Sequence, residues 1–177
     1  VNGKRYPVVA DSVWTGERIP GGDNAFDRFV LRRGYMMVVA ENEDGTGAGK
    51  VYVAAEKELE AELDASLKKR VSFVRVLPWN YATKRGIGGN FARKEELGLS
   101  WFYTWGVSDL ESTSIDYVPM CWSGCDEALV QRIVDNTFIT HVLAFNEPEG
   151  KDQANPSPQQ AVERYARIPK TGSRVGS

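Results

Sequence analysis

Residues 138–149 read Phe-Ile-Thr-His-Val-Leu-Ala-Phe-Asn-Glu-Pro-Glu, an apolar run that ends in Asn146-Glu147-Pro148. A short apolar run is typical of a buried strand, and a proline stiffens the turn that follows it. In barrels of parallel strands, the carboxyl ends of the strands carry the catalytic groups. The run therefore predicts a strand that delivers Glu147 to a loop as a candidate general acid or base. Of the two glutamates, Glu147 is expected to point inward and Glu149 to be solvated.

Apolar segments of this kind recur along the chain. They are residues 71–77, 99–105, 115–121 and 138–145, and a further strand is expected to begin at Arg174-Val175. Between the last two complete segments, residues 126–135 have the apolar spacing of an amphipathic helix. Residues 157–167 begin with a Ser cap and a Pro in the first turn, which predicts a second helix. Alternating strands and helices indicate a parallel sheet.

The spacing of the segments indicates a barrel. The segment centres Arg75, Tyr103, Val118 and Leu143 are separated by 28, 15 and 25 residues. A (β/α)₈ barrel of about 250 residues needs roughly 31 residues for each unit, so the short interval implies a helix reduced to a loop. The predicted fold class is α/β of the (β/α)₈ TIM-barrel type, with only about the first half of the barrel present.

The chain before residue 71 has a different pattern. Residues 29–31, 34–40 and 50–54 are β-rich, and Asp44-Gly45 is a hairpin signal between the last two. Residues 56–70 are ambiguous and are interpreted as a short edge strand followed by a helical connector. The predicted domains are therefore residues 1–70, a β-rich accessory region with a connector, and residues 71–177, a partial catalytic barrel.

Composition and charge exclude several classes of protein. The 177-residue chain is 42% hydrophobic and 26% charged with a net charge of −2, which gives no basic surface for nucleic acid. No apolar run is long enough to span a membrane, and no signal peptide is visible. Cys121, Cys125 and His141 supply too few ligands for a zinc site. Two ordinary thiols are expected, with a local disulfide as the alternative, and neither a metal nor a cofactor is predicted.

Aromatic residues follow the predicted strands. The first strand runs into Trp79 and Asn80, the second into Trp105, and the third into Trp122. Flat apolar faces of sugars stack on aromatic rings, so this arrangement predicts a carbohydrate-binding cleft; the alternative is that the rings only seal the barrel end. Tyr103 precedes Trp105 by two residues and therefore shares its strand face.

Two polar residues complete the predicted site. A charge inside a strand is costly unless it is paired, so Arg75 is interpreted as an inward side chain that pairs with a site carboxylate. Asn146, directly before Glu147, is placed to hold the sugar hydroxyl next to the reacting carbon.

The ordered motifs resemble glycoside hydrolase family 128. The resemblance covers roughly residues 71–177 and is carried by four segments: residues 73–80 (Phe-Val-Arg-Val-Leu-Pro-Trp-Asn), 100–105 (Ser-Trp-Phe-Tyr-Thr-Trp), 117–122 (Tyr-Val-Pro-Met-Cys-Trp) and 143–149 (Leu-Ala-Phe-Asn-Glu-Pro-Glu). It implies a retaining endo-β-1,3-glucanase in which Glu147 is the general acid/base, Asn146 contacts the substrate, and the tryptophans form sugar subsites. The expected ligand is a β-glucan oligosaccharide or polysaccharide.

The resemblance also implies that part of the enzyme is missing. The family's nucleophile is a second Glu on a later strand of the barrel, which this chain does not reach. A retaining enzyme needs two carboxyl groups about 5–5.5 Å apart, so the chain alone is expected to be inactive without the remainder of the barrel. Secretion or a cell-surface location is expected from the polymeric substrate.

Two alternatives remain open. One is a non-catalytic glucan-binding protein that uses the same tryptophans to hold polysaccharide. The other is a related barrel glycosidase that acts on β-1,4-linked or mixed-linkage glucan, because related barrels share an Asn-Glu pair.

Overall fold

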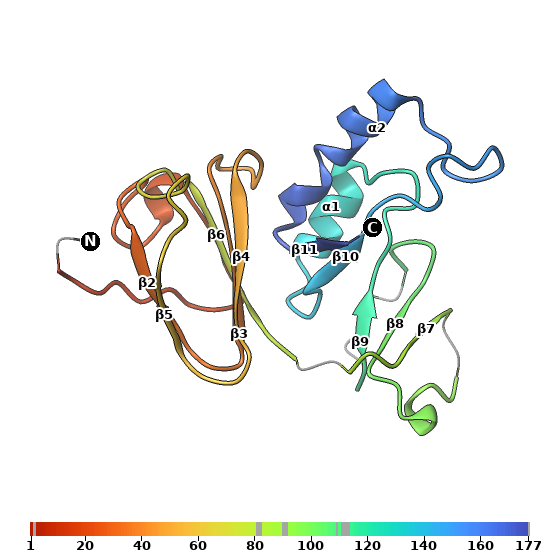
Figure 1. Ribbon diagram of the computed structural model, residues 1–177, viewed down its shortest axis with the longest axis horizontal. Coiled ribbons are helices and arrows are strands. Elements are labelled where there is room, and N and C mark those ends of the chain that lie inside the picture. Colours follow the sequence, from red (N-terminus) through yellow and green to blue (C-terminus); the bar gives the residue numbers. More distant parts are fainter. Residues whose placement is uncertain (2, 81–82, 90–91, 109, 111–113, 177) are drawn as a thin grey trace. The chain divides into compact units, whose positions relative to one another are not determined.

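The computed structural model describes residues 1–177 except 2, 81–82, 90–91, 109, 111–113 and 177. The chain forms two compact units, Val1–Asn80 and Tyr81–Ser177 (Figure 1). Within the described residues, no helix is both long enough and apolar enough to cross a membrane.

The first unit is built from antiparallel strands. One sheet has the order β1-β6-β3-β4, formed by Val13–Thr15, Phe73–Pro78, Tyr35–Ala40 and Gly49–Ala54. The other pairs β2 (Arg28–Leu31) with β5 (Leu59–Glu62), and a 3₁₀ turn, η1 (Gly16–Arg18), follows β1. The predicted β-rich segments are thus confirmed.

The predicted hairpin between β3 and β4 is also confirmed. The two strands pair antiparallel from Tyr35 opposite Ala54 to Ala40 opposite Gly49. In the connecting turn, Gly45 has a φ of 84°, a left-handed conformation that glycine adopts without steric cost.

Alternation along β3 and β6 gives the first sheet two apolar faces. Met37, Val39, Val74 and Val76 belong to a core cluster that includes residues of β2 and of the segments around β5. On the opposite face, a second cluster is formed by Met36, Val38, Ala40, Phe73 and Leu77. Both clusters are made of side chains that are 9% exposed or less.

The prediction that residues 71–77 form the first strand of the barrel is wrong. β6 pairs antiparallel with both β3 and β1, so it is a central strand of the first unit. The division of the chain accordingly falls after Asn80 and not at residue 70. A central strand buried on both faces gives the same uninterrupted apolar run as a parallel barrel strand, and the run does not indicate which partner the strand pairs with.

The second unit contains parallel strands that lie in the order in which they occur in the chain. They are β7 (Gly86–Gly88), β8 (Trp101–Tyr103), β9 (Asp116–Val118), β10 (His141–Leu143) and β11 (Arg174–Gly176). β7, β8 and β9 pair in parallel, as do β10 and β11. A parallel bridge between Met120 and Leu143 joins the two groups. The sequence predicted every one of these strands except β7, whose Gly-Ile-Gly has too few apolar residues to be recognised.

Helical segments connect these strands. They are η2 (Glu95–Leu97) before β8, α1 (Glu127–Val134) before β10, and α2 (Pro158–Tyr165) with η3 (Ile168–Thr171) before β11. Both predicted helices are confirmed. Asp126 caps α1 by accepting a hydrogen bond from the amide of Leu129, and Ser157 forms a capping box with Gln160 at the start of α2.

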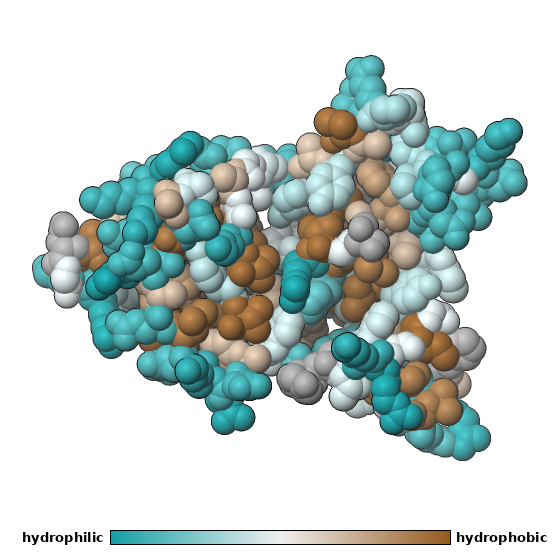
Figure 2. Space-filling view, in the orientation of Figure 1, coloured by the Kyte–Doolittle hydropathy of each residue, from teal (hydrophilic) through white to brown (hydrophobic). Residues whose placement is uncertain are grey.

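One face of the parallel sheet is the core of the second unit. Phe102, Tyr117 and Val142, from three different strands, form a buried cluster with Val130 and Ile133 of α1. The connection between β10 and α2 projects from the sheet in Figure 1, and its surface is largely hydrophilic in Figure 2. This connection carries Asn146 and Glu147.

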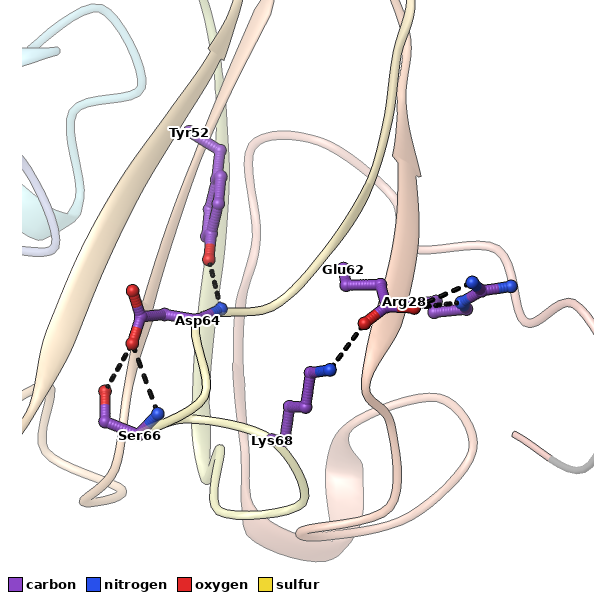
Figure 3. A network of polar contacts seen from close by, with 6 residues as sticks. All are labelled: Arg28, Tyr52, Glu62, Asp64, Ser66 and Lys68. Carbon is purple, nitrogen blue, oxygen red and sulfur yellow. Dashed lines mark hydrogen bonds and ion pairs between the residues drawn. The ribbon is translucent and has the colours of Figure 1, made fainter.

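The segment after β5 is held by polar side chains (Figure 3). The Asp64 carboxylate accepts hydrogen bonds from the backbone amide (3.2 Å) and hydroxyl (2.9 Å) of Ser66, and the Asp64 amide donates to the hydroxyl of Tyr52 (2.9 Å). Such local bonds compete with helix formation. Residues 65–69 consequently form turns, so the predicted helical connector is wrong.

Ion pairs surround the same segment. Glu62 receives hydrogen bonds from Lys68 and from Arg28 (2.7 Å to Nη2), and Lys50 pairs with Asp64 at 3.0 Å (Figure 3 draws the Glu62 pairs). The hydrogen bond from Lys68, followed by that from Arg28, lowers the pKa of Glu62 to about 2. The bonds from Lys50 and Ser66 lower the pKa of Asp64 to about 2 as well.

We expect Glu62 to contribute to stability in a defined pH range. Because its pKa is lowered in the folded state, its contribution is present above the ordinary value of 4.5 and is lost as the pH falls towards 2. At pH 7, Glu62→Gln should lower the urea concentration at the midpoint of unfolding, followed by the NMR signals of β2 and β5. The difference in midpoint from the wild type should shrink between pH 4.5 and pH 2. The matched control is Glu58→Gln, an exposed carboxylate before β5. An equal loss at pH 7 and pH 2 would contradict the assignment.

Candidate functional site

The carboxyl ends of β8, β9 and β10 lie along one edge of the parallel sheet. The amide of Met120 donates to the carbonyl of Gly106 at 3.1 Å, which joins the end of β8 to the segment after β9. The amide of Asn146 donates to the carbonyl of Trp122 at 2.9 Å, which joins that segment to the end of β10. The segments that carry Trp105, Trp122 and Asn146 therefore lie at the same edge.

An aromatic row runs along β8 towards this edge. The ring centroids of Trp101 and Tyr103 lie 6.4 Å apart, and those of Tyr103 and Trp105 lie 5.3 Å apart. Trp105, at the end of the row, is 54% exposed. Trp101 was not predicted as a site residue, although its two-residue spacing from Tyr103 places it on the same strand face.

Glycines of β7 make room for the row. A Cβ atom at Gly86 would lie 2.0 Å from Cε2 of Trp101, and one at Gly88 would lie 2.9 Å from the ring of Tyr103. No side chain larger than hydrogen fits at Gly86 unless the indole moves. The rings of β8 therefore lie directly against the neighbouring strand.

The hydroxyl of Tyr117 fixes the loop that carries Trp105. It donates to the carbonyl of Gly106 at 2.9 Å, accepts from the amide of Ser108 at 3.2 Å, and lies 2.8 Å from Oγ1 of Thr104. Tyr117 is only 5% exposed and belongs to the core cluster. The buried Tyr117 thus fixes the loop on both sides of Trp105, through Thr104 and Gly106.

A disulfide closes the loop that carries Trp122. Cys121 and Cys125 are bonded, so the prediction of two ordinary thiols is wrong and its alternative is confirmed. Gly124 has a φ of 101°, and its amide donates to the carbonyl of Cys121 at 2.9 Å, which turns the chain so that the cysteines meet. The sequence spacing alone did not reveal this glycine turn. Arg164 of α2 donates to the carbonyl of Ser123 at 3.1 Å from outside the loop.

Asn146 and Glu147 lie in the loop beyond β10, which ends at Leu143. Glu147 is exposed and has a φ of 42°, and its carbonyl accepts a hydrogen bond from the amide of Gly150 at 2.9 Å. The expectation that Glu147 alone points inward is wrong, because Glu147 and Glu149 are both exposed. The strand stops before the acid, so alternation along it does not determine which way Glu147 points.

The remaining predicted site residues lie in the first unit. Arg75 belongs to β6 and is 2% exposed, Trp79 packs against the Met36 cluster, and Asn80 is the last residue of the unit. The prediction that they extend from a strand of the same sheet as Asn146 is therefore wrong. Within the described part of the chain, no three His, Cys, Asp or Glu side chains are grouped to hold a metal ion.

The family of the chain follows from its sequence. The model of the glycosyl hydrolase catalytic core matches residues 77–176, which is more than half of the chain. The chain therefore belongs to the glycosyl hydrolase catalytic core family. The comparison with curated proteins gives no significant match.

Solved structures give partial matches. A substituted form of a GH128 (subgroup I) endo-β-1,3-glucanase from Amycolatopsis mediterranei, in complex with laminaripentaose, is 31% identical with a TM-score of 0.46; the match covers 54% of this chain and 43% of that one. The same glucanase with laminaritriose is 28% identical with a TM-score of 0.45, covering 55% and 43%. A βγ-crystallin domain from Flavobacterium johnsoniae is 17% identical with a TM-score of 0.36, covering 44% and 83%. The chain thus matches less than half the length of the glucanase, and the family assignment rests on the sequence model.

Removing the hydroxyl of Tyr117 should loosen the Trp105 loop. Tyr117→Phe keeps the buried ring but removes the hydrogen bonds of the hydroxyl to the Gly106 carbonyl and the Ser108 amide, each of which contributes about 0.5–1.5 kcal/mol. Hydrogen exchange at the Ser108 amide should accelerate while exchange in β10 stays unchanged. The control is Tyr103→Phe, because Tyr103 contributes ring contacts to the row. Equal Ser108 exchange in Tyr117→Phe and the wild type would contradict the role of the hydroxyl.

The disulfide should stabilise the second unit and the Trp122 loop together. Closing so short a loop restricts the unfolded chain and contributes about 2 kcal/mol in the chain-entropy model. A Cys121→Ser/Cys125→Ser double variant should lose this amount in urea unfolding, and exchange of the Asn146 amide, which donates to Trp122, should accelerate. The wild type treated with dithiothreitol serves as the matched control and should behave like the variant. If neither stability nor Asn146 exchange changes, the disulfide does not hold this loop.

Proposed function

We propose that the chain is part of the catalytic domain of a retaining endo-β-1,3-glucanase of the family 128 type. One observation carries the proposal: in a member of the glycosyl hydrolase catalytic core family, consecutive parallel strands bring Trp105, Trp122 and the Asn146-Glu147 pair to one edge. Catalytic groups lie at this end of the strands in barrel enzymes. The sequential parallel order of the strands supports a (β/α)₈ barrel whose remaining strands lie outside this chain.

The proposed site lies in the second unit alone. Trp105 and Trp122 are the sugar platforms, and Tyr103 packs edge-on against the ring of Trp105. The exposed face of Trp105 offers apolar area to a glucosyl ring, and its loop is fixed in advance by Tyr117. A platform that is already ordered loses little conformational entropy when sugar binds.

Glu147 is the proposed general acid/base. In the first step it protonates the departing glycosidic oxygen while a second carboxylate attacks the anomeric carbon, and in the second step it takes a proton from the water that releases the glycosyl-enzyme. The resemblance to family 128 implies that the nucleophile is a second Glu on a later strand of the barrel, so it is proposed to come from outside this chain. Because Glu147 is exposed, the substrate is able to reach it.

The substrate class comes from the relatives. The matching glucanase structures hold laminaripentaose or laminaritriose, so a laminarin-like β-1,3-glucan is the proposed ligand. A polymer of this size is met outside the cell, which supports a secreted or cell-surface location. The chain alone, with one carboxyl of the pair, is proposed to bind glucan without cleaving it.

A non-catalytic glucan-binding protein is the second candidate. It is favoured by the position of Glu147, which is exposed in the loop beyond the end of β10. The two candidates differ in their need for carboxyl groups: hydrolysis requires both Glu147 and the nucleophile, whereas binding requires neither.

Substituting Glu147 should separate binding from hydrolysis. In a protein that carries the complete catalytic core, Glu147→Gln should lower the turnover of laminarin by about 10²–10⁴, the usual contribution of a general acid/base, while laminaripentaose affinity is retained. Glu149→Gln, two residues away and also exposed, is the matched control and should keep its turnover. Reducing-sugar release from laminarin, barley glucan and xylan identifies the linkage.

Three results would overturn parts of this proposal. Unchanged turnover in Glu147→Gln would remove Glu147 from catalysis. Binding without any turnover in the unsubstituted complete core would favour the binding protein. Preferential hydrolysis of barley glucan or xylan would reassign the linkage.

A further inference from the structure

The side chain of Asn146 is held by a neighbour that the proposed mechanism does not use. Nδ2 of Asn146 donates a hydrogen bond to Oε1 of Gln153 at 2.7 Å, and both side chains are partly buried. The backbone of Asn146 is held as well, because its amide donates to Trp122 at 2.9 Å and its carbonyl accepts from Ala154 at 3.3 Å. Asn146 is therefore fixed both to the Trp122 loop and to the far end of its own loop.

The loop is shaped so that Gln153 reaches Asn146. The Gly150 amide donates to the carbonyl of Glu147 at 2.9 Å, and the Gln153 amide donates to the carbonyl of Gly150 at 3.0 Å, which folds the chain back on itself. A Cβ atom at Gly150 would lie 2.9 Å from Cγ of Gln153. Because Gly150 has no side chain, Gln153 has room to approach Asn146.

The bond leaves a defined set of atoms for a ligand. A primary amide offers two N–H donors and one carbonyl acceptor. Gln153 takes one donor of Asn146 and fixes the orientation of the amide, and no other described residue bonds its second N–H or its Oδ1. Without Gln153, the amide is able to rotate, and the donor and acceptor no longer keep separate positions.

We infer that Gln153 is a positioning residue that orients the Asn146 amide towards a sugar hydroxyl beside Glu147. This inference rests on the proposed function for the sugar ligand, but the bond between the two amides is a property of the chain itself. Gln153 acts through Asn146 and does not touch the substrate. Removing Gln153 should cost one well-aligned neutral hydrogen bond to the sugar, which corresponds to an affinity about three- to tenfold lower.

Three variants of the 177-residue chain test the inference. Gln153→Met keeps the length of the side chain and removes the acceptor, whereas Gln153→Glu keeps an acceptor at the same position. Gln159→Met is the matched control, because it removes a side-chain hydrogen bond of similar length (3.0 Å to Glu163) on the exposed surface of α2. For each variant, the side-chain amide resonances of Asn146 are recorded by NMR, and laminaripentaose affinity is measured by titration.

In the wild type and in Gln153→Glu, the two side-chain amide protons of Asn146 should have well-separated chemical shifts, and one of them should exchange slowly with water. In Gln153→Met they should converge and exchange faster, and laminaripentaose affinity should fall about three- to tenfold, whereas Gln159→Met should match the wild type. Unchanged Asn146 resonances in Gln153→Met would overturn the inference, as would an affinity loss that Gln153→Glu shares fully. If the resonances respond as expected but even the wild type binds no glucan, the bond stands and the proposed function fails.

Discussion

The backbone hydrogen bonds between residues 119–122 and residues 143–146 hold together the edge of the parallel sheet where β8, β9 and β10 end. The amide of Leu143 donates to Pro119, that of Cys121 donates to Leu143, and that of Asn146 donates to Trp122, each at 2.8–2.9 Å. These bonds continue the parallel pairing from β9 to β10 after β9 itself has ended. Without them the β7–β9 and β10–β11 groups would be separate sheets. Trp122 would then not lie beside Asn146.

Each connection at this edge is also held by its own local device. A buried phenol holds the loop after β8, a disulfide closes the segment after β9, and a pair of amides closes the loop after β10. The devices differ in chemistry but have the same effect, since each one orders a side chain that extends from the sheet. Loops that are ordered before a ligand arrives lose less entropy on binding, which is the property that a carbohydrate site built on a rigid sheet requires.

The sequence predicted the elements of the second unit better than their partners. The apolar run ending at Phe145, the Asp126 and Ser157 caps and the final strand were all recognisable, because periodicity and capping are local signals. The run at residues 71–77 was misassigned because two-sided burial looks the same in an antiparallel sandwich and in a parallel barrel. β7 was missed because its glycines, which leave room for the rings of Trp101 and Tyr103, give no apolar pattern. The loop beyond β10 depends on the φ of 42° at Glu147 and on the amide pair, and no residue pattern encodes either.

We propose that the edge formed by Trp105, Trp122 and Asn146 is a glucan-binding surface. The most direct measurement is an NMR titration of the 177-residue chain with laminaritriose, followed through the indole N–H signals and the backbone amides. If this edge binds glucan, saturable shifts are expected at the indoles of Trp105 and Trp122 and at the amides around Asn146, with the buried strand residues of the first unit unaffected. Saturable shifts confined to the first unit, or no shift at any of these three residues, would contradict it.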